Sequence, residues 1–295
     1  MKRTFVACRR TVVVDGTPLM GIVNASPESF SGDGSSELQV QVDLALRQVA
    51  AGALVVDIGG QSANTRTPTL AVEDEVARVV PLIEAVRAAS DAVISVDTYK
   101  PAVADACLAA GADVINDVSG LHHPELADVV ASWGAGYVLM HTVGPPKSKI
   151  LDPHRYDDVV SAVLSFVDAK LSQLATAGVD PDQVIVDPGL DFGKTPRQSL
   201  ELVHRAGALH AAIEGPLLFA ISRKDFIGAI AMTGPLDRAP GTLAVAGALA
   251  AAAPSSLLRV HDVAGTAQYL AVRAAIDAPE VLDPGAVLPD HLRRV

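Results

Sequence analysis

Residues 40–60, VQVDLALRQVAAGALVVDIGG, contain the unit from which most of the chain is built. Apolar residues recur at helical spacing from Val40 to Ala51, and a β-branched run from Ala53 to Gly60 follows directly. A helix joined by a short turn to a continuously apolar strand is typical of parallel sheets that are covered on both faces.

The same alternation recurs along the whole sequence. Together with the run above, we predict eight strands: Pro18 to Asn24, Ala53 to Gly60, Ala92 to Thr98, Val114 to Gly120, Gly136 to Thr142, Gln183 to Leu190, Leu217 to Lys224 and Ser256 to Val263. Further helical spacing marks Val72 to Ala89, Ala102 to Ala110, Asp157 to Ala177 and Thr242 to Ala253. Eight such strands fit a closed barrel better than an open sheet, so we predict a single (β/α)8 TIM barrel domain over residues 1–295.

The two ends of the chain lie outside this alternation. Thr4 to Val14, followed by Asp15-Gly16, predicts a short β-hairpin that closes the bottom of the barrel. The Pro-rich stretch 278–295 is expected to be a tail. No uninterrupted apolar span of about 18 residues occurs, and the first ten residues lack a signal-peptide pattern. We therefore expect a cytoplasmic protein without a membrane partner.

The charge and cysteine content exclude several classes of function. The net charge of -11 argues against a nucleic-acid partner, because phosphate backbones require clustered Lys and Arg. Any anionic ligand must therefore be held by a few local cations. Cys8 and Cys107 are the two cysteines and lie far apart, so neither a disulfide framework nor a thiolate metal site is implied.

Each predicted strand ends in a polar residue, and in this fold the active site lies at those carboxyl ends. The set is Asn24, Asp57, Asp97, Asn116 with Asp117, His141, Asp187, Lys224, and Arg259 with His261. One polar strand end is usually a turn former, but eight of eight form a coherent set.

Two chemistries are present among these strand ends. Asp97, Asn116 and Asp187 offer oxygen acceptors for the N–H-rich edge of a pterin or purine. Lys224 and Arg259, with His261, offer cationic donors for phosphate. The combination favours transfer of a heterocyclic group from a diphosphate ester.

Several of these segments, in this order, resemble dihydropteroate synthase. They are Gly21-Ile-Val-Asn-Ala-Ser-Pro-Glu-Ser-Phe30, Asp57-Ile-Gly-Gly60, Ile94-Ser-Val-Asp-Thr-Tyr99, Ile115-Asn-Asp-Val-Ser-Gly120, Leu139-Met-His141, Asp187-Pro-Gly-Leu-Asp-Phe-Gly-Lys-Thr195, Ser222-Arg-Lys224 and Arg259-Val-His-Asp262. The resemblance runs from about Pro18 to about Ala275. It implies condensation of 6-hydroxymethyl-dihydropterin pyrophosphate with p-aminobenzoate, with release of pyrophosphate.

The resemblance also implies roles for individual residues and partners. The pterin-binding positions are Asp97, Asn116, Asp187 and Lys224, and the pyrophosphate positions are Arg259, His261 and Arg66. Asn24 corresponds to the position that helps to hold Mg2+, the implied cofactor. A homodimer is implied as well, and the Ala-rich stretch Leu243 to Ala253 suits close helix packing.

Departures from the family pattern gather in the acceptor half, whose positions are Phe30, Phe192, Asp225 and Pro68. Residues 60–68 read GQSANTRTP, which changes both the length and the acid of the second loop, and residues 31–34 read SGDG. Asp225 stands where the resemblance implies Ser or Arg beside the aminobenzoate carboxylate. Two such carboxylates would repel by roughly 1 to 4 kcal/mol. Asp191 replaces a usual Gly.

Three interpretations remain open from the sequence. The favoured one is a paralogue that keeps the pterin pyrophosphate site, with synthase activity weak or lost, or with another acceptor. The second is an active synthase that tolerates these changes and binds aminobenzoate or sulfonamide-like mimics. The third, a pterin-binding methyltransferase domain, leaves Lys224 and Arg259 with His261 without a purpose.

Overall fold

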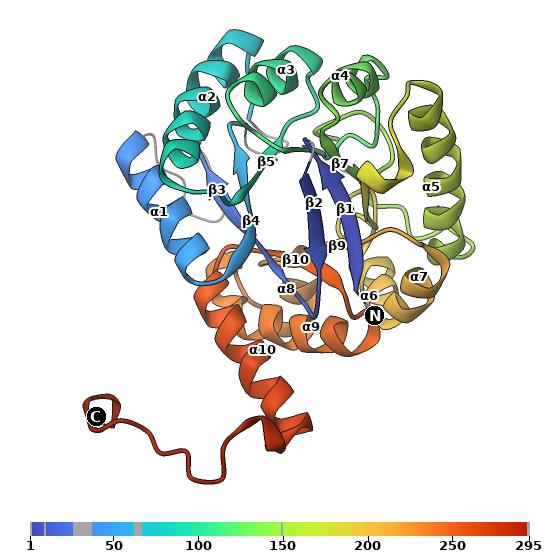
Figure 1. Ribbon diagram of the computed structural model, residues 1–295. Helices are drawn as coiled ribbons and strands as arrows, with labels where there is room; N and C mark the ends of the chain where they lie inside the picture. The colour runs from blue at the N-terminus through green and yellow to red at the C-terminus, as the bar shows by residue number, and fades with distance from the viewer. Residues whose placement is uncertain (1, 9, 26–36, 62–66, 149, 294–295) are drawn as a thin grey trace.

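A computed structural model describes residues 2–8, 10–25, 37–61, 67–148 and 150–293, and its centre is a closed parallel barrel (Figure 1). The strands pair in the order β10-β3-β4-β5-β6-β7-β8-β9. Their bounds are β3 Leu19–Asn24, β4 Ala53–Gly59, β5 Val93–Asp97, β6 Val114–Asp117, β7 Gly136–Met140, β8 Val184–Asp187, β9 Leu217–Ala220 and β10 Ser256–Val260. The predicted (β/α)8 barrel is confirmed.

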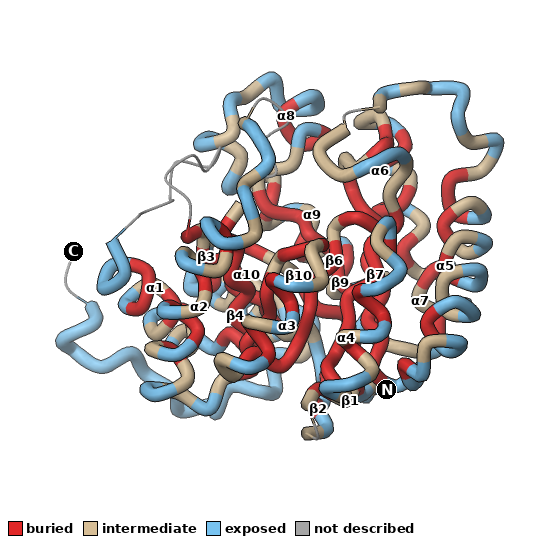
Figure 2. Tube along the Cα trace, turned by 90° about the horizontal axis from the view of Figure 1, so that it is seen from above, coloured by how far each residue is buried: buried red, intermediate tan, exposed pale blue. Residues whose placement is uncertain are grey.

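Helices surround the barrel as an outer ring (Figure 1). They are α1 Leu38–Ala50, α2 Val72–Ala89, α3 Pro101–Ala109, α4 Glu125–Trp133, α5 Val159–Thr176, α6 Pro196–His204, α7 Ala206–Ala212, α8 Asp225–Ala231, α9 Ala239–Ala252 and α10 Val263–Asp277. The strands are buried, whereas the outer faces of the helices are exposed (Figure 2). Helix α5 is long and apolar enough to cross a membrane, but its Val163 and Val167 side chains are buried in the barrel's hydrophobic core.

Most predicted strands begin within a residue of the observed ones but end too late. The prediction carried β6 to Gly120 and β9 to Lys224, whereas they end at Asp117 and Ala220. The Asp117 carboxylate accepts the backbone N–H groups of Ser119 and Leu121 at 2.8 and 2.7 Å. Such side-chain bonds to the backbone stop a strand by forming a turn.

The barrel interior is arranged in layers because alternate residues of a strand face the same side. Every strand contributes one residue to an apolar layer near the amino-terminal end: Met20, Val55, Val93, Val114, Val138, Ile185, Leu218 and Leu257. The residues two positions later face the same interior. They are Ile22, Asp57, Ser95, Asn116, Met140, Asp187, Ala220 and Arg259, so five of the eight strands place a polar side chain there.

The expected hairpin is confirmed as β1 (Arg3–Ala7) paired with β2 (Arg10–Val14), and it lies across the barrel end in Figure 1. Phe5 and Val12 belong to the same hydrophobic cluster as the apolar layer and are almost fully buried. The hairpin therefore seals the end of the barrel opposite the polar strand ends.

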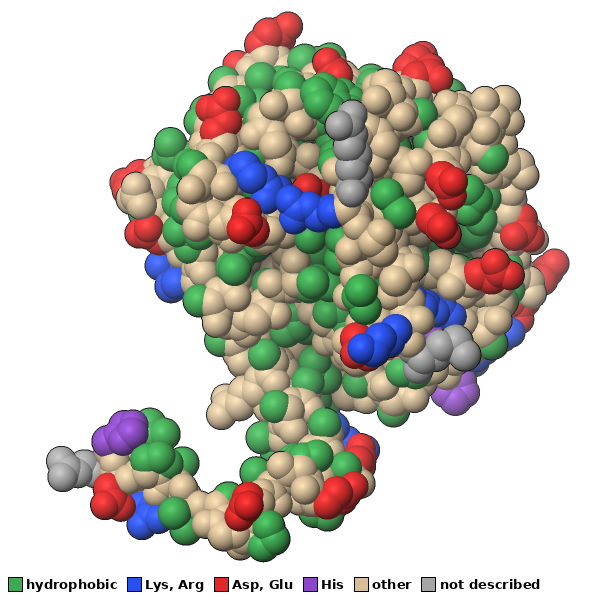
Figure 3. All heavy atoms as spheres, viewed as in Figure 1, with side chains coloured by type: hydrophobic (Ala, Val, Ile, Leu, Met, Phe, Trp, Pro, Cys, Tyr) green, Lys and Arg blue, Asp and Glu red, His purple; other side chains and the backbone are tan. Residues whose placement is uncertain are grey.

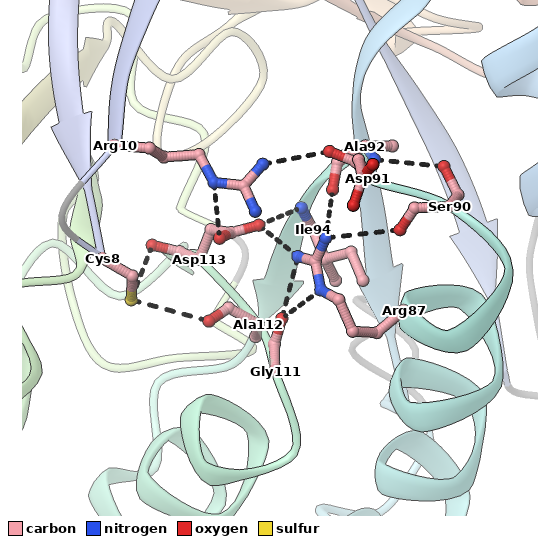
Figure 4. A network of polar contacts seen from close by, with 10 residues as sticks. All are labelled: Cys8, Arg10, Arg87, Ser90, Asp91, Ala92, Ile94, Gly111, Ala112 and Asp113. Atoms are coloured by element: carbon pink, nitrogen blue, oxygen red, sulfur yellow. Dashed lines mark hydrogen bonds and ion pairs between the residues drawn. The ribbon is translucent and has the colours of Figure 1, made fainter.

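A buried carboxylate, Asp113, fastens this hairpin to the outer ring (Figure 4). Its oxygens lie 3.3 Å from Arg10 Nε and 2.5 Å from Arg87 Nη2, and they accept the Ile94 N–H at 2.9 Å. Arg87 also donates twice to the Gly111 carbonyl. A buried charge needs this degree of pairing, and the network joins β2, α2 and β5.

The C-terminal segment leaves α10 and runs away from the barrel (Figure 1). It contains two single 3-10 turns, Pro279–Val281 and Asp290–Leu292, and residues 279–293 are all exposed. On the hairpin face of the molecule, acidic and basic side chains are interspersed rather than gathered (Figure 3).

The hairpin plug gives a stability prediction. Phe5→Ala should lower the free energy of unfolding by about 3–5 kcal/mol, because it leaves a cavity beside the apolar layer. Urea denaturation followed by circular dichroism measures the change. Val13→Ala is the matched control, because Val13 lies on the same hairpin and is 49% exposed. Equal effects of the two substitutions would contradict the claim that the buried face of the hairpin stabilises the barrel.

Candidate functional site

The polar layer is organised around the Asp57 carboxylate, whose side chain is fully buried. It accepts hydrogen bonds from Ser95 Oγ at 2.6 Å, Asn116 Nδ2 at 3.0 Å and Arg259 Nε at 2.6 Å. These partners come from β5, β6 and β10, and all belong to one layer of the interior. The pairing fixes the side chain of Asn116 and the guanidinium of Arg259.

Arg259 also reaches Asp97 at the end of β5, with Nη2 3.1 Å from Oδ2. Burial raises the pKa of Asp97 to about 7 with Asp57 adding to the rise, while Arg259 opposes it. The pKa of Arg259 itself is raised: burial lowers it, but the Asp57 and Asp97 charges outweigh that effect. Arg259 is therefore a fixed cation at the mouth of the barrel.

Asp187 lies at the end of β8 and is almost completely buried. Its Oδ1 accepts the Gly189 N–H at 2.7 Å, and Gly189 has a φ of 70° with the His141 carbonyl close to where a Cβ would stand. Burial raises the pKa of Asp187, and the Gly189 N–H and Lys224 oppose the rise. This buried carboxylate is an acceptor suited to paired N–H donors.

Lys224 lies beyond β9, at the residue preceding α8, rather than at the strand end that the sequence predicts. Its Nζ donates to the Leu190 carbonyl at 2.9 Å and lies 4.6 Å from the centroid of the Phe192 ring. Burial lowers its pKa, and Asp191 and Asp187 oppose that shift. The ammonium thus links the β9–α8 turn to the loop after β8.

His261 and Asn24 lie at the ends of the neighbouring strands β10 and β3. His261 Nδ1 is 2.7 Å from Ser222 Oγ. The buried Gln48 of α1 donates to the carbonyls of Ile22 and His261, at 2.9 and 3.4 Å. Gln48 therefore holds the two strand ends side by side, next to the cation Arg259.

The buried Lys194 side chain ties the loop after β8 to the end of β7. Lys194 is 1% exposed, and its Nζ donates to the carbonyls of His141, Gly189 and Phe192 at 2.9–3.1 Å. Burial lowers its pKa to about 7, yet these three acceptors match the three N–H donors of the charged form. Lys194 therefore holds the loop after β8 in place.

The acceptor positions are only partly described. Phe30 and Arg66 lie outside the described residues. Pro68 is exposed, and its carbonyl accepts a hydrogen bond from Lys147 at 3.2 Å. Asp225 Oδ1 is 3.0 Å from Arg238 Nη1, and its side chain is 56% exposed. The expected repulsion by Asp225 is therefore reduced, because the charge is both paired and screened by solvent.

Sequence reasoning missed the roles of Asp57, Ser95 and Gln48. Asp57 was in the strand-end set without a function, and the signal that could have found it is the two-residue period that places it in register with Asn116 and Arg259. Gln48 gives no comparable signal, since it is one of several polar residues on an amphipathic helix and nothing local distinguishes it from Gln39 or Gln41.

The arrangement combines acceptors and cations in one mouth. Asp97, Asn116 and Asp187 supply oxygen acceptors, while Arg259 and Lys224 carry positive charge. Two of the five guanidinium donors of Arg259 serve Asp57 and Asp97, so further donors exist for an anion. Such a mouth can hold a heterocycle joined to a phosphate-type leaving group.

Comparison with known proteins agrees with this geometry. Residues 20–261 match the family described as "Pterin binding enzyme". The chain is 35% identical over 264 residues to dihydropteroate synthase of Escherichia coli, covering 89% of this chain and 93% of that protein. It is 40% identical over 278 residues to "Inactive dihydropteroate synthase 2" of Mycobacterium tuberculosis, covering 91% and 86%.

Solved structures give the same relationship. A Yersinia pestis dihydropteroate synthase with a sulfonamide drug complex superposes with a TM-score of 0.86 at 32% identity, over 94% of this chain and 99% of that one. A Xanthomonas albilineans dihydropteroate synthase with 4-aminobenzoic acid gives 0.83 at 36% identity, with the same coverage.

The Asp57 hub predicts a large loss of stability when its charge is removed. Asp57→Ala should lower the free energy of unfolding by about 3–5 kcal/mol, because Arg259 loses its buried partner. Urea denaturation measures the change. Asp277→Ala, which removes an exposed pair with Arg273, serves as control and should leave the urea midpoint unchanged. An Asp57 variant as stable as this control would refute the claim that the buried Asp57–Arg259 pairing stabilises the barrel.

His141 predicts a pH dependence of stability. Burial lowers its pKa from 6.5 to about 3, with Lys194 contributing, so the folded protein keeps it neutral. As pH falls below 6.5 the unfolded chain binds this proton first, and stability decreases until pH 3. Between pH 7.5 and 5 the wild type should lose about 2 kcal/mol more than His141→Leu. Parallel stability–pH curves for the two proteins would exclude this origin.

Proposed function

Because this chain belongs to the dihydropteroate synthase family of pterin-binding enzymes, we propose that it binds 6-hydroxymethyl-dihydropterin pyrophosphate and that its p-aminobenzoate half is altered. Asp97, Asn116, Asp187 and Lys224 bind the pterin in this proposal. Arg259 and His261, with Arg66, bind the pyrophosphate. Synthase activity with p-aminobenzoate is then weak or lost.

One observation carries the pterin half of the proposal. Asp57 fixes Asn116 and Arg259 in one buried layer, and Arg259 in turn contacts Asp97. The groups that would bind the ring and the group that would bind the leaving anion are thus held by one network. Preorganised donors and acceptors of this kind cost no rearrangement when the ligand arrives.

The proposed chemistry needs no covalent enzyme intermediate. The acceptors at Asp97, Asn116 and Asp187 orient the pterin, so that its exocyclic methylene carbon points toward the incoming amine. Arg259 stabilises the charge that develops on the departing pyrophosphate. Phe192, half-buried against Lys224, forms an apolar wall that limits access of water to the reacting carbon.

Magnesium fits this site as an ion that arrives with the substrate. Among the described residues there is no cluster of three His, Cys, Asp or Glu side chains that could hold a metal. Asn24 offers a hard amide oxygen at the end of β3, and Mg2+ is commonly bound by few protein ligands and by substrate phosphates. When bound, the ion would neutralise charge on the pyrophosphate.

The p-aminobenzoate half decides whether the family reaction is retained, and two relatives favour different outcomes. The 40% identical mycobacterial relative is named inactive, which supports loss of synthase activity. The Escherichia coli relative is named dihydropteroate synthase, which supports the alternative, an active synthase in folate biosynthesis. Under that alternative p-aminobenzoate and sulfonamide-like mimics bind beside Phe192.

We also propose a homodimer in the cytoplasm. Of the fourteen residues of the apolar helix α9, three are buried: Thr242, Ala246 and Leu249. Ile230, Met232 and Leu236, on α8 and the turn after it, are 63–87% exposed. A second copy of the chain would cover this neighbouring apolar surface.

Pyrophosphate release tests the proposal. Purified protein with dihydropterin pyrophosphate and Mg2+ should bind the pterin, measured by fluorescence titration. Its release of pyrophosphate with p-aminobenzoate should be roughly tenfold or more slower than that of the Escherichia coli synthase. Asp187→Asn should weaken pterin binding roughly ten- to hundredfold, because a charge-assisted hydrogen bond is lost.

The control and the opposing outcomes are defined by the same assay. Asp182→Asn, an exposed acid of the turn preceding β8, should bind pterin like the wild type. A p-aminobenzoate-dependent rate equal to that of the Escherichia coli enzyme would establish the active synthase instead. Absence of pterin binding would overturn both proposals.

A further inference from the structure

The loop after β4 begins between two groups of the proposed site. Gly59, the last residue of β4, pairs with Asn24 of β3 on one side and with Asp97 of β5 on the other. The loop therefore starts between the residue proposed to hold Mg2+ and a residue proposed to bind the pterin. Further along it, Thr67 directly follows Arg66, which the proposed function assigns to the pyrophosphate. The position of this loop therefore bears on how the pyrophosphate is bound.

A buried ion pair closes the base of the loop. The ammonium of Lys100, the residue preceding α3, lies 2.6 Å from Glu75 Oε2 of α2, and both side chains are largely shielded from solvent. Lys100 Nζ also donates to the Leu70 carbonyl at 2.6 Å. Gln61 Oε1 accepts the Leu70 N–H at 2.8 Å, and Gln61 Nε2 donates to Tyr99 Oη at 3.0 Å. The beginning and the end of the loop are thus held together.

A second lysine reaches the same loop from a strand that is not its neighbour. Lys147 belongs to the loop between β7 and α5, and β5 and β6 separate β7 from β4 in the barrel. Its Nζ donates to the Thr67 carbonyl at 2.6 Å, to Thr67 Oγ1 at 2.9 Å and to the Pro68 carbonyl at 3.2 Å. These three acceptors match the three N–H donors of an ammonium. Hydrogen bonds from a charged donor are the strong ones, so Lys147 ties the two loops together.

The loop after β7 is itself supported by the loop after β8. A Cβ added at Gly193 would overlap the Val143 side chain, so the backbone of Gly193 packs closely against the loop after β7. Tyr156, further along the loop after β7, donates from its hydroxyl to the Gly193 carbonyl at 3.1 Å. Lys147 therefore extends from a loop that is held on its other side, as a tether requires.

We propose that Lys147 is a positioning residue for the pyrophosphate half of the site, because it holds residues 67–68 and thereby fixes the loop after β4 for the incoming phosphate groups. The inference rests on the proposed pterin pyrophosphate site. A loop that is already held loses less conformational entropy when the ligand binds. Removing the tether should therefore weaken binding of the pyrophosphate group and leave the contacts of the pterin ring with β5, β6 and β8 unchanged.

Two ligands that differ only in the pyrophosphate group separate these two effects. Fluorescence titration gives the Kd of 6-hydroxymethyl-dihydropterin pyrophosphate with Mg2+ and the Kd of 6-hydroxymethyl-dihydropterin, and their ratio measures the contribution of the pyrophosphate. Lys147→Met removes the three donors and keeps a long side chain. It should weaken binding of the pyrophosphate ester roughly tenfold and change the Kd of 6-hydroxymethyl-dihydropterin by less than about twofold.

Lys170→Met is the matched control. Lys170 is also half-buried and donates to a loop carbonyl, that of Leu121 at 3.3 Å, but it stands on α5 and supports the loop after β6. This variant should keep the wild-type ratio of the two Kd values. Thr67→Val removes one acceptor of Lys147 and should shift the ratio in the same direction by roughly two- to fivefold. It decides the question if thermal unfolding shows that Lys147→Met does not fold.

The opposing outcomes are distinct. A wild-type ratio in the folded Lys147→Met variant, or an equal loss of affinity for both ligands, would overturn the inference, because a merely structural role does not single out the pyrophosphate. If the wild type binds both ligands equally well, the pterin site stands and the inference fails. If the wild type binds neither ligand, the proposed function itself fails, and the inference fails with it.

Discussion

The buried pairing of Asp57 with Arg259 is the interaction on which the mouth of this barrel depends. Arg259 stands on β10 and reaches over β3 to β4, where it meets a carboxylate that is fully shielded from water. A charge in that position is tolerated only when its partners are present. The same carboxylate holds Asn116, so one group positions both this amide and the Arg259 cation.

The apolar layer beneath stabilises the barrel and so offsets the cost of burying this polar network. Eight apolar side chains, one from each strand, fill the barrel below the charges, and the hairpin covers the far end. Hydrophobic burial there stabilises the strands independently of the ions, while Asp113 ties the hairpin to α2 and β5. The fold can therefore carry several buried charges at its mouth, where function requires them.

The two halves of the site differ in how they are built. The residues proposed to bind pterin stand mainly on strands, whose pairing allows little movement. The residues proposed for the p-aminobenzoate half stand on the loop after β8 and at the start of α8, where Asp191 adopts a left-handed conformation and Asp225 shares Arg238 with two carbonyls. Loops tolerate changes in length and charge far better than strands. The proposed divergence of the p-aminobenzoate half alone is consistent with this contrast.

The sequence by itself determined the barrel, the hairpin and the strands that carry Asp97, Asn116, Asp187 and Arg259, because hydrophobic periodicity is a local property of the chain. It placed Lys224 on a strand, since nothing local shows that β9 ends at Ala220. Only the tertiary structure decided which of these groups meet. Asp57 and Arg259 are 202 residues apart, and their contact arises from closure of the barrel. Likewise, the contact of Asp191 with Asp225 depends on how the loop after β8 packs against the start of α8, which no local pattern encodes.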